Sequence, residues 1–269
     1  MGLVIWHPHA FIARTRAPRH PLTLSHYWSK WFVRIDAMHC KDLRGLHAIA
    51  AGSLFMHLVH NCAALGATVP ARLEALNVRM KVYQTRENRT EHPMPALRLE
   101  NLKLEGWHML NGKLVKAANN RSLVPFLQHC AYKYLSPHGG YSSATRKVCD
   151  ALVAIERIMY SSNMFFDDAQ KLAFKNEFLK LGQNWMYLRN VCYGLEIDAW
   201  QIRPKVHYCC HLPSQGDLIN PRFTQVYGEE SLIGKVARVW RASAQGPFHA
   251  TIQKSALSRY ATGLEVRLT

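Results

Sequence analysis

The chain has 269 residues, 48% of them hydrophobic, which is enough to bury a sizeable core and excludes wholesale disorder. Lys and Arg number 34 against 18 Asp and Glu, and the formal charge of +16 favours a polyanionic partner, because each neutralised phosphate releases a counterion. The longest apolar stretch, residues 48–65, contains His57, His60 and Asn61 and is too polar to span a membrane, which excludes transporters and receptors.

The cysteines and the first residues bear on the compartment. Seven cysteines, an odd number, lie mostly in apolar helical patterns, which favours reduced core thiols over a disulfide framework. No secretory signal is visible in the first 18 residues. We therefore expect the cytoplasm or the nucleus, with nucleic acid as the preferred partner. An acidic membrane surface, or a charge that serves only solubility, is the alternative for the basic excess.

The first half of the chain predicts one strand and then helices. The first 35 residues contain no Asp or Glu and form a basic segment over residues 1–30. Residues 31–36 (WFVRID) predict a strand that ends in an acid. Apolar residues then recur every three to five positions over residues 43–59, which predicts a helix. Pro70 suits the first turn of a second helix, which continues to Tyr83.

The middle of the chain predicts a helical block. Residues 117–135 form one segment, which Pro125 should kink or divide. Ser142 or Ser143 can cap the next helix, whose apolar positions are Val148, Leu152, Ile155 and Met159. Asp167 and Asp168 favour the start of a third helix. Its apolar positions alternate by four and three, which is the most regular pattern in the chain: Phe174, Phe178, Leu181, Trp185, Leu188 and Cys192.

The last seventy residues are less regular. Residues 203–212 (RPKVHYCCHL) are compatible with a strand or a helix. A helix is expected over residues 229–241 and another over residues 250–262, separated by Gly246 and Pro247. Residues 264–268 fit a closing strand.

Four kinds of chemistry compete on these residues. Asp36 at a strand end and Glu229–Glu230 at a helix start suit a two-metal carboxylate site, in which two ions lie about 4 Å apart. Residues 207–211 (HYCCH) offer zinc ligands, although adjacent cysteines do not match the usual spacing. Fifteen histidines make a Cys/His or Ser/His pairing conceivable, but no nucleophile signature is present. No Walker or GxGxxG motif is present, which disfavours nucleotide triphosphates as partners.

Three sequence islands resemble a known family. Residues 35–39 (IDAMH), 204–212 (PKVHYCCHL) and 227–235 (YGEESLIGK) are similar to segments of cut-and-paste transposases of the RNase H-like DDE/D superfamily. Within that superfamily, the sequence most resembles the CACTA and Kyakuja–Dileera–Zisupton groups. Its overall sequence character also resembles transposase-like chains of dinoflagellates. The resemblance spans about residues 31–262, although its specific motifs amount to only about twenty residues in these three islands.

The resemblance implies a fold and a set of site residues. The fold would be α/β by ancestry but mainly α, with a partial RNase H-like core over residues 31–40 and 201–269 and an all-helical insertion over 41–200. Asp36 and Glu230 would bind Mg²⁺ or Mn²⁺, with Glu229 as the alternative ligand and His39 and His211 in support. DNA contacts would come from the basic residues of the core segments: Arg34, Lys205, Lys235, Arg238 and Arg241.

The sequence departs from the family pattern where catalysis is concerned. The first metal-binding acid normally lies upstream of the second, but the first 35 residues contain no acid. Two carboxylates under-ligate two metals, so we expect cleavage by this chain alone to fail. The expected function is a transposase-like DNA-binding protein with a remnant phosphodiester-cleavage site. A homo-oligomer is compatible with this function. The alternative is a non-catalytic helical nucleic-acid-binding or assembly protein.

Overall fold

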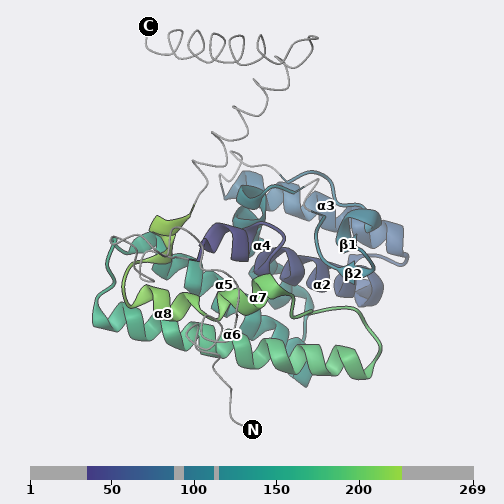
Figure 1. Ribbon diagram of the computed structural model, residues 1–269. Helices are drawn as coiled ribbons and strands as arrows, with labels where there is room; N and C mark the ends of the chain where they lie inside the picture. The colour runs from purple at the N-terminus through teal and green to yellow at the C-terminus, as the bar shows by residue number, and fades with distance from the viewer. Residues whose placement is uncertain (1–34, 88–93, 112–114, 226–269) are drawn as a thin grey trace, which may run out of the picture. The chain divides into compact units, whose positions relative to one another are not determined.

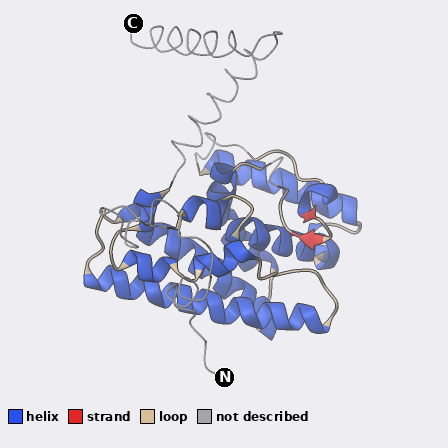
Figure 2. Cartoon of the chain, in the orientation of Figure 1, coloured by secondary structure: helices blue, strands red, loops and turns tan. Residues whose placement is uncertain are grey.

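The computed structural model describes residues 35–87, 94–111 and 115–225, and these are mainly helical (Figures 1 and 2). The chain divides at Arg34, and the described residues all belong to the second unit, Ile35–Thr269. The basic N-terminal segment, Arg34 and everything from residue 226 onward lie outside the described residues. This includes Glu229, Glu230, Lys235, Arg238 and Arg241, together with the helices and the strand expected there.

The elements follow one another as short helical turns and longer helices. A π-helical turn η3 (Met38–Asp42) leads to α2 (Leu46–Asn61), the 3₁₀ turn η4 (Ala63–Leu65) and α3 (Val69–Arg86). The turn η5 (Leu99–Leu102) precedes the two-residue strands β1 (Lys103–Leu104) and β2 (Trp107–His108). Then come α4 (Ala117–Tyr134), α5 (Gly140–Ser161), α6 (Asp168–Gly194), α7 (Pro204–Cys209), α8 (Leu212–Gly216) and the turn η6 (Pro221–Thr224).

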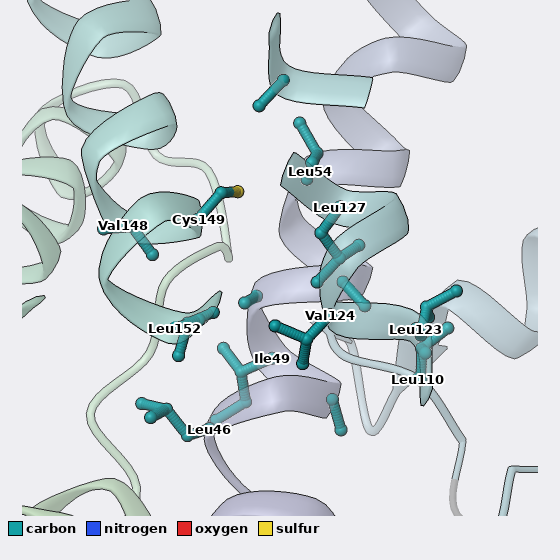
Figure 3. Packing of buried hydrophobic residues seen from close by; sticks show 14 of the residues in the cluster. Leu46, Ile49, Leu54, Leu110, Leu123, Val124, Leu127, Val148, Cys149 and Leu152 are labelled. Carbon is teal, nitrogen blue, oxygen red and sulfur yellow. The ribbon is translucent and has the colours of Figure 1, made fainter. Parts of the chain in front are cut away.

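Helix α2 is the centre of the core. It is buried along nearly its whole length and contacts α3, α4, α5 and α7. Figure 3 shows Leu46, Ile49 and Leu54 of α2 among apolar residues of α4 and α5. A helix that is apolar on all sides is expected at the centre of a bundle. Gly52 is required where the backbone of residues 108 and 109 crosses α2, because a Cβ there would lie 2.5 Å from the Met109 Cα.

Helices α5 and α6 form the longest antiparallel pair (Figure 1). Asp167 caps α6 by accepting the backbone N–H of Gln170 at 2.7 Å. In turn, the Gln170 side chain accepts the backbone N–H of Asp167 at 3.1 Å, which completes a capping box. All six apolar positions expected on this helix are buried, as are the four expected on α5. These two predictions of the helix faces are confirmed.

The structure corrects or decides several sequence expectations. Pro125 does not divide α4, because the neighbouring Val124 and Phe126 are fully buried and packing holds the helix through the lost hydrogen bond. Helix α5 begins at Gly140 with Gly139 as its N-cap, so neither serine caps it. Of the two alternatives for residues 203–212, the helix is found: α7 covers Pro204–Cys209, and Leu212 begins α8. The β1–β2 hairpin was not anticipated, and it turns through Glu105 and Gly106, both with positive φ.

The expected strand at residues 31–36 has only its last two residues in the described part of the chain. Ile35 and Asp36 form no strand pairing there, and a helical turn begins immediately after them. The described part of residues 41–200 is helical apart from the hairpin and the connecting loops. None of the helices in the described ranges combines the length and hydropathy needed to cross a bilayer.

Candidate functional site

The segment from Ile35 to Leu43 is held in place by residues from the far end of the described chain. The Gln215 side chain accepts the backbone N–H of Ile35 at 2.8 Å and donates to its carbonyl oxygen at 3.1 Å. The hydroxyl of Thr224 donates to the same carbonyl at 3.2 Å. These bonds satisfy the backbone polar groups of Ile35 with side chains, so the segment is fixed without pairing to any strand of the described chain.

Asp36 and His39 form the solvent-facing side of this segment. One Asp36 oxygen accepts the backbone N–H of Met38 at 2.9 Å, and the other contacts the imidazole Nδ1 of His39. The side chains are 19% and 38% exposed, respectively. Asp36 therefore accepts the first N–H of η3 and presents one carboxylate with an attached imidazole to solvent.

The first and second sequence islands lie against each other. Helix α7 packs on η3, and the Lys205 ammonium donates to the Leu43 carbonyl oxygen at 2.6 Å. The Cys209 thiol donates to the sulfur of Cys40, which lowers the pKa of Cys40 although burial opposes the change. Burial raises the pKa of Cys209 well above the usual range. Residues about 165 positions apart in the chain thus form one small unit.

His211 lies next to this unit, at the start of α8. Its ring meets that of His207 edge-on, with centroids 5.2 Å apart. Partial burial, followed by the proximity of His207, lowers the pKa of His211. Cys210 is exposed while Cys209 is buried, and the four candidate zinc ligands of residues 207–211 do not form a converging group. Among the described residues, a converging set of three ligands occurs elsewhere.

That set is the buried ion cluster, which we define as Lys41, Asp42, His47 and Glu156. One oxygen of Asp42 lies 3.1 Å from the Lys41 ammonium and 2.8 Å from Nδ1 of His47. The same ammonium contacts Glu156, whose oxygen lies 3.6 Å from Nε2 of His47. The side chains of the first three are fully buried, and that of Glu156 is 14% exposed.

The charge balance of the cluster depends on Lys41. Burial alone would lower the pKa of its ammonium, but the carboxylates of Asp42 and Glu156 outweigh burial and raise that pKa. Ligand atoms of Asp42, His47 and Glu156 lie within 4.8 Å of one another, which would suit a metal ion. The Lys41 ammonium already contacts both carboxylates, so the protein supplies its own cation.

Sequence reasoning missed this cluster. Lys41 and Asp42 follow directly after the first island, and Glu156 sits beside the apolar positions Ile155 and Met159 of α5. The signal available in the sequence was one acid, Glu156, next to the buried apolar positions of α5. Its partner could not be recognised, because 115 residues separate Lys41 from Glu156.

The residues around Asp36 do not complete a two-metal centre. A pair of Mg²⁺ ions needs several carboxylates. Around Asp36 the described residues supply its own carboxylate, the imidazole of His39 and the buried thiol of Cys40. Nitrogen and sulfur donors suit softer ions than Mg²⁺. The described donors therefore do not fit the metal pair that the resemblance implies.

A cation–aromatic surface occurs on α3, α4 and the start of α5, and sequence analysis did not identify it. The guanidinium carbon of Arg86 lies 5.6 Å from the ring centre of Tyr83. Arg146 lies 4.1 Å from the ring centre of Tyr132, and Arg79 lies 5.3 Å from that of Tyr134. The first pair lies within α3, three residues apart, whereas the other two join different helices, so the surface as a whole has no fixed spacing in the chain.

A separate hollow of about 780 Å³ lies among α2, the β1–β2 hairpin and the end of α6. His57 and His108 line it, and burial lowers the pKa of both imidazoles, to about 4 for His108. The Tyr141 ring packs against His57 at 4.7 Å. These imidazoles are neutral near pH 7, so they add no positive charge for a polyanion.

Comparison of the chain with protein-family models, with curated proteins and with solved structures finds no match.

Proposed function

We propose that this chain is a transposase-like DNA-binding protein that does not cleave DNA by itself. The observation that carries the proposal is the contact between the first two islands. Residues 35–39 and 204–212 resemble transposase segments, and η3 and α7 pack directly on each other. Islands that share one ancestral site should meet in the fold, whereas chance similarities have no reason to do so.

The third island lies outside the described residues, but chain length limits its position. Thr224 contacts Ile35, and Glu230 follows six residues later. Six extended residues span at most about 20 Å, so Glu230 can reach the neighbourhood of Asp36. This supports a remnant site that pairs these two acids. The described donors around Asp36 do not fit two metals, so we assign no cleavage step.

The formal charge of +16 supports DNA as the partner. Arginine and lysine bind phosphate without reading sequence, so the expected affinity is sensitive to salt and tolerant of sequence. A protein that neutralises about six phosphates loses on the order of 10³ in affinity between about 50 and 200 mM salt. Fluorescence anisotropy with a labelled duplex measures this slope. An affinity that does not change with salt would refute DNA binding through phosphates.

The remnant site is tested separately. Asp36→Asn and Glu230→Gln should leave duplex affinity within about twofold in the absence of metal, because a carboxylate does not bind a phosphate without a bridging cation. A remnant site predicts that Mn²⁺ strengthens DNA binding and that either substitution removes the increment. Glu100→Gln, which changes an exposed carboxylate on the turn η5, is the matched control. An equal Mn²⁺ response in wild type and in both variants would exclude these acids as ligands. Metal-dependent nicking by the purified chain would contradict the proposed lack of cleavage.

A further inference from the structure

A groove of about 410 Å³ opens between the end of α3 and the second half of α4. Three rings line it: Tyr83 from α3, and His129 and Tyr132 from α4. This volume lies within the range of pockets that hold small planar ligands. The groove is remote in sequence from the three islands, so it belongs to no part of the site described above.

The rings are held in place from below by the core. Phe126 is fully buried, and its ring centre lies 5.3 Å from that of Tyr83 and 6.2 Å from that of His129. The Tyr83 and His129 rings lie 5.3 Å apart. Partial burial, and then the charges of Lys133 and Arg86, lower the pKa of His129, so it presents a neutral flat ring at pH 7. A planar group can therefore stack here without first ordering the protein.

Asp150 fixes the polar edge of the groove. Its two oxygens accept the side-chain amide of Gln128 and the hydroxyl of Tyr132, each at 2.7 Å. One acid thus orients one amide and one phenol beside the rings. Groups of this kind can bond to the edge of a nucleobase.

Positive charge surrounds the same rings. The Arg86 guanidinium lies over Tyr83, and the Arg146 guanidinium lies over Tyr132. Lys133 follows Tyr132 on the exposed side of α4. The carboxylates of Glu87, 2.9 Å from Arg86, and of Asp150 at the polar edge offset part of this charge. A strand whose base enters the groove would bring its phosphates to these cations.

We propose that this groove binds an unpaired base of single-stranded DNA. The inference rests on the proposed function, because it specifies which form of DNA the protein recognises. The base stacks on Tyr83 and His129, and the flanking phosphates bind Arg86 and Arg146. In a duplex both faces of each base are covered by neighbouring pairs, so a groove lined by rings can receive only an unpaired base.

The test compares three labelled probes with the full chain: a blunt duplex, the same duplex with a single-stranded extension, and a single-stranded oligonucleotide. Tyr83→Leu removes the ring but keeps an apolar side chain against Phe126. It should weaken binding of the single strand by about 5- to 100-fold, the effect of one lost base stack, and leave blunt-duplex affinity within about twofold. His129→Leu should act in the same direction.

Tyr193→Leu is the matched control, because Tyr193 on α6 is 73% exposed and has Arg189 at 5.1 Å from its ring centre. It has the same kind of cation–aromatic pair outside the groove and should change neither affinity. Thermal unfolding by circular dichroism confirms that each variant is folded. If wild type binds the duplex but Tyr83→Leu and His129→Leu leave single-strand affinity unchanged, the groove does not bind the base, while the proposed DNA-binding function stands. If wild type binds none of the probes, the proposed function fails and the inference falls with it.

Discussion

Replacing Lys41 by Met tests the buried ion cluster most directly. Lys41 and Asp42 have fully buried side chains, and the ammonium contacts two carboxylates. Methionine fills a similar volume, so the change removes charge and little packing. Breaking a buried ion pair by removing one partner costs about 3–5 kcal/mol, because the remaining charges stay in a medium of low polarity. A domain is stable by only about 5–15 kcal/mol, so the loss should be large.

Urea unfolding followed by tryptophan fluorescence measures this loss. Trp185 and Trp200 are buried and meet edge-on with ring centres 5.1 Å apart, so they report on the core. The midpoint should fall with little change in slope. Lys171→Met is the control, since Lys171 pairs with the fully exposed carboxylate of Asp168, and such a pair contributes about 0–1 kcal/mol.

The double variant Lys41→Met with Glu156→Gln completes the argument. Removing a carboxylate together with its cation leaves fewer unpaired charges, so the second change should recover part of the stability lost in the first. If Lys41→Met unfolds within about 1 kcal/mol of wild type, as a surface change would, Lys41 does not balance the cluster. The interpretation of the cluster as a self-supplied cation site would then be wrong.

Three further predictions concern other parts of the structure. In the Lys41→Met variant the remaining cluster ligands should bind Zn²⁺, so added Zn²⁺ should raise its melting temperature and leave that of wild type unchanged; equal shifts would contradict this. Gly52→Ala should lower the free energy of unfolding by about 1–3 kcal/mol, because its Cβ meets the Met109 backbone. Gly182→Ala on α6 has open space around it and should raise the free energy of unfolding by about 0.5–1 kcal/mol. Urea unfolding measures both changes. The pKa of His108 is lowered to about 4 in the fold, chiefly by burial, so the unfolded chain binds more protons between about pH 4 and 6.5. Stability should therefore fall by about 1–2 kcal/mol as pH drops through this window, the figure being reduced for partial exposure, and His108→Gln should flatten the profile.

Helix α6 shows what local sequence can determine. Its apolar positions repeat at the helical period, and the Asp167 cap begins it with a bond to the third residue. Both signals lie within a few residues of each other and need no distant partner. The same holds for the buried face of α5. A long amphipathic helix is therefore predictable because its pattern is repeated several times.

The segment around Asp36 shows the opposite case. Only Ile35 and Asp36 of the run WFVRID are described; Ile35 is fixed by Gln215 from 180 residues away, and a helical turn follows directly after Asp36. Short apolar runs do not decide between strand and helix by themselves. Here the decision depends on α7 and α8, which pack on the segment from a distance. Local propensity cannot contain that information.

The candidate sites also differ in how much of each can be recognised in the sequence. The islands containing Asp36 and Lys205 were recognisable as sequences, and their contact appeared only in the fold. The buried ion cluster and the groove at Tyr83 each combine residues from separate helices. Neither has a fixed spacing in the chain. Sites assembled between helices are therefore the part of function that a single sequence conceals.

The clasp formed by Gln215 and Thr224 on Ile35 brings the two ends of the described chain together. Because residues 35 and 225 lie close together, the described part of the chain can be linked to another protein through two adjacent linkers without distortion of either protein. It also tolerates new ends, so a short linker from residue 225 to residue 35 should permit circular permutation at an exposed loop such as residues 136–139. The first and last parts of the described chain are thus mechanically coupled, although 189 positions separate Ile35 from Thr224.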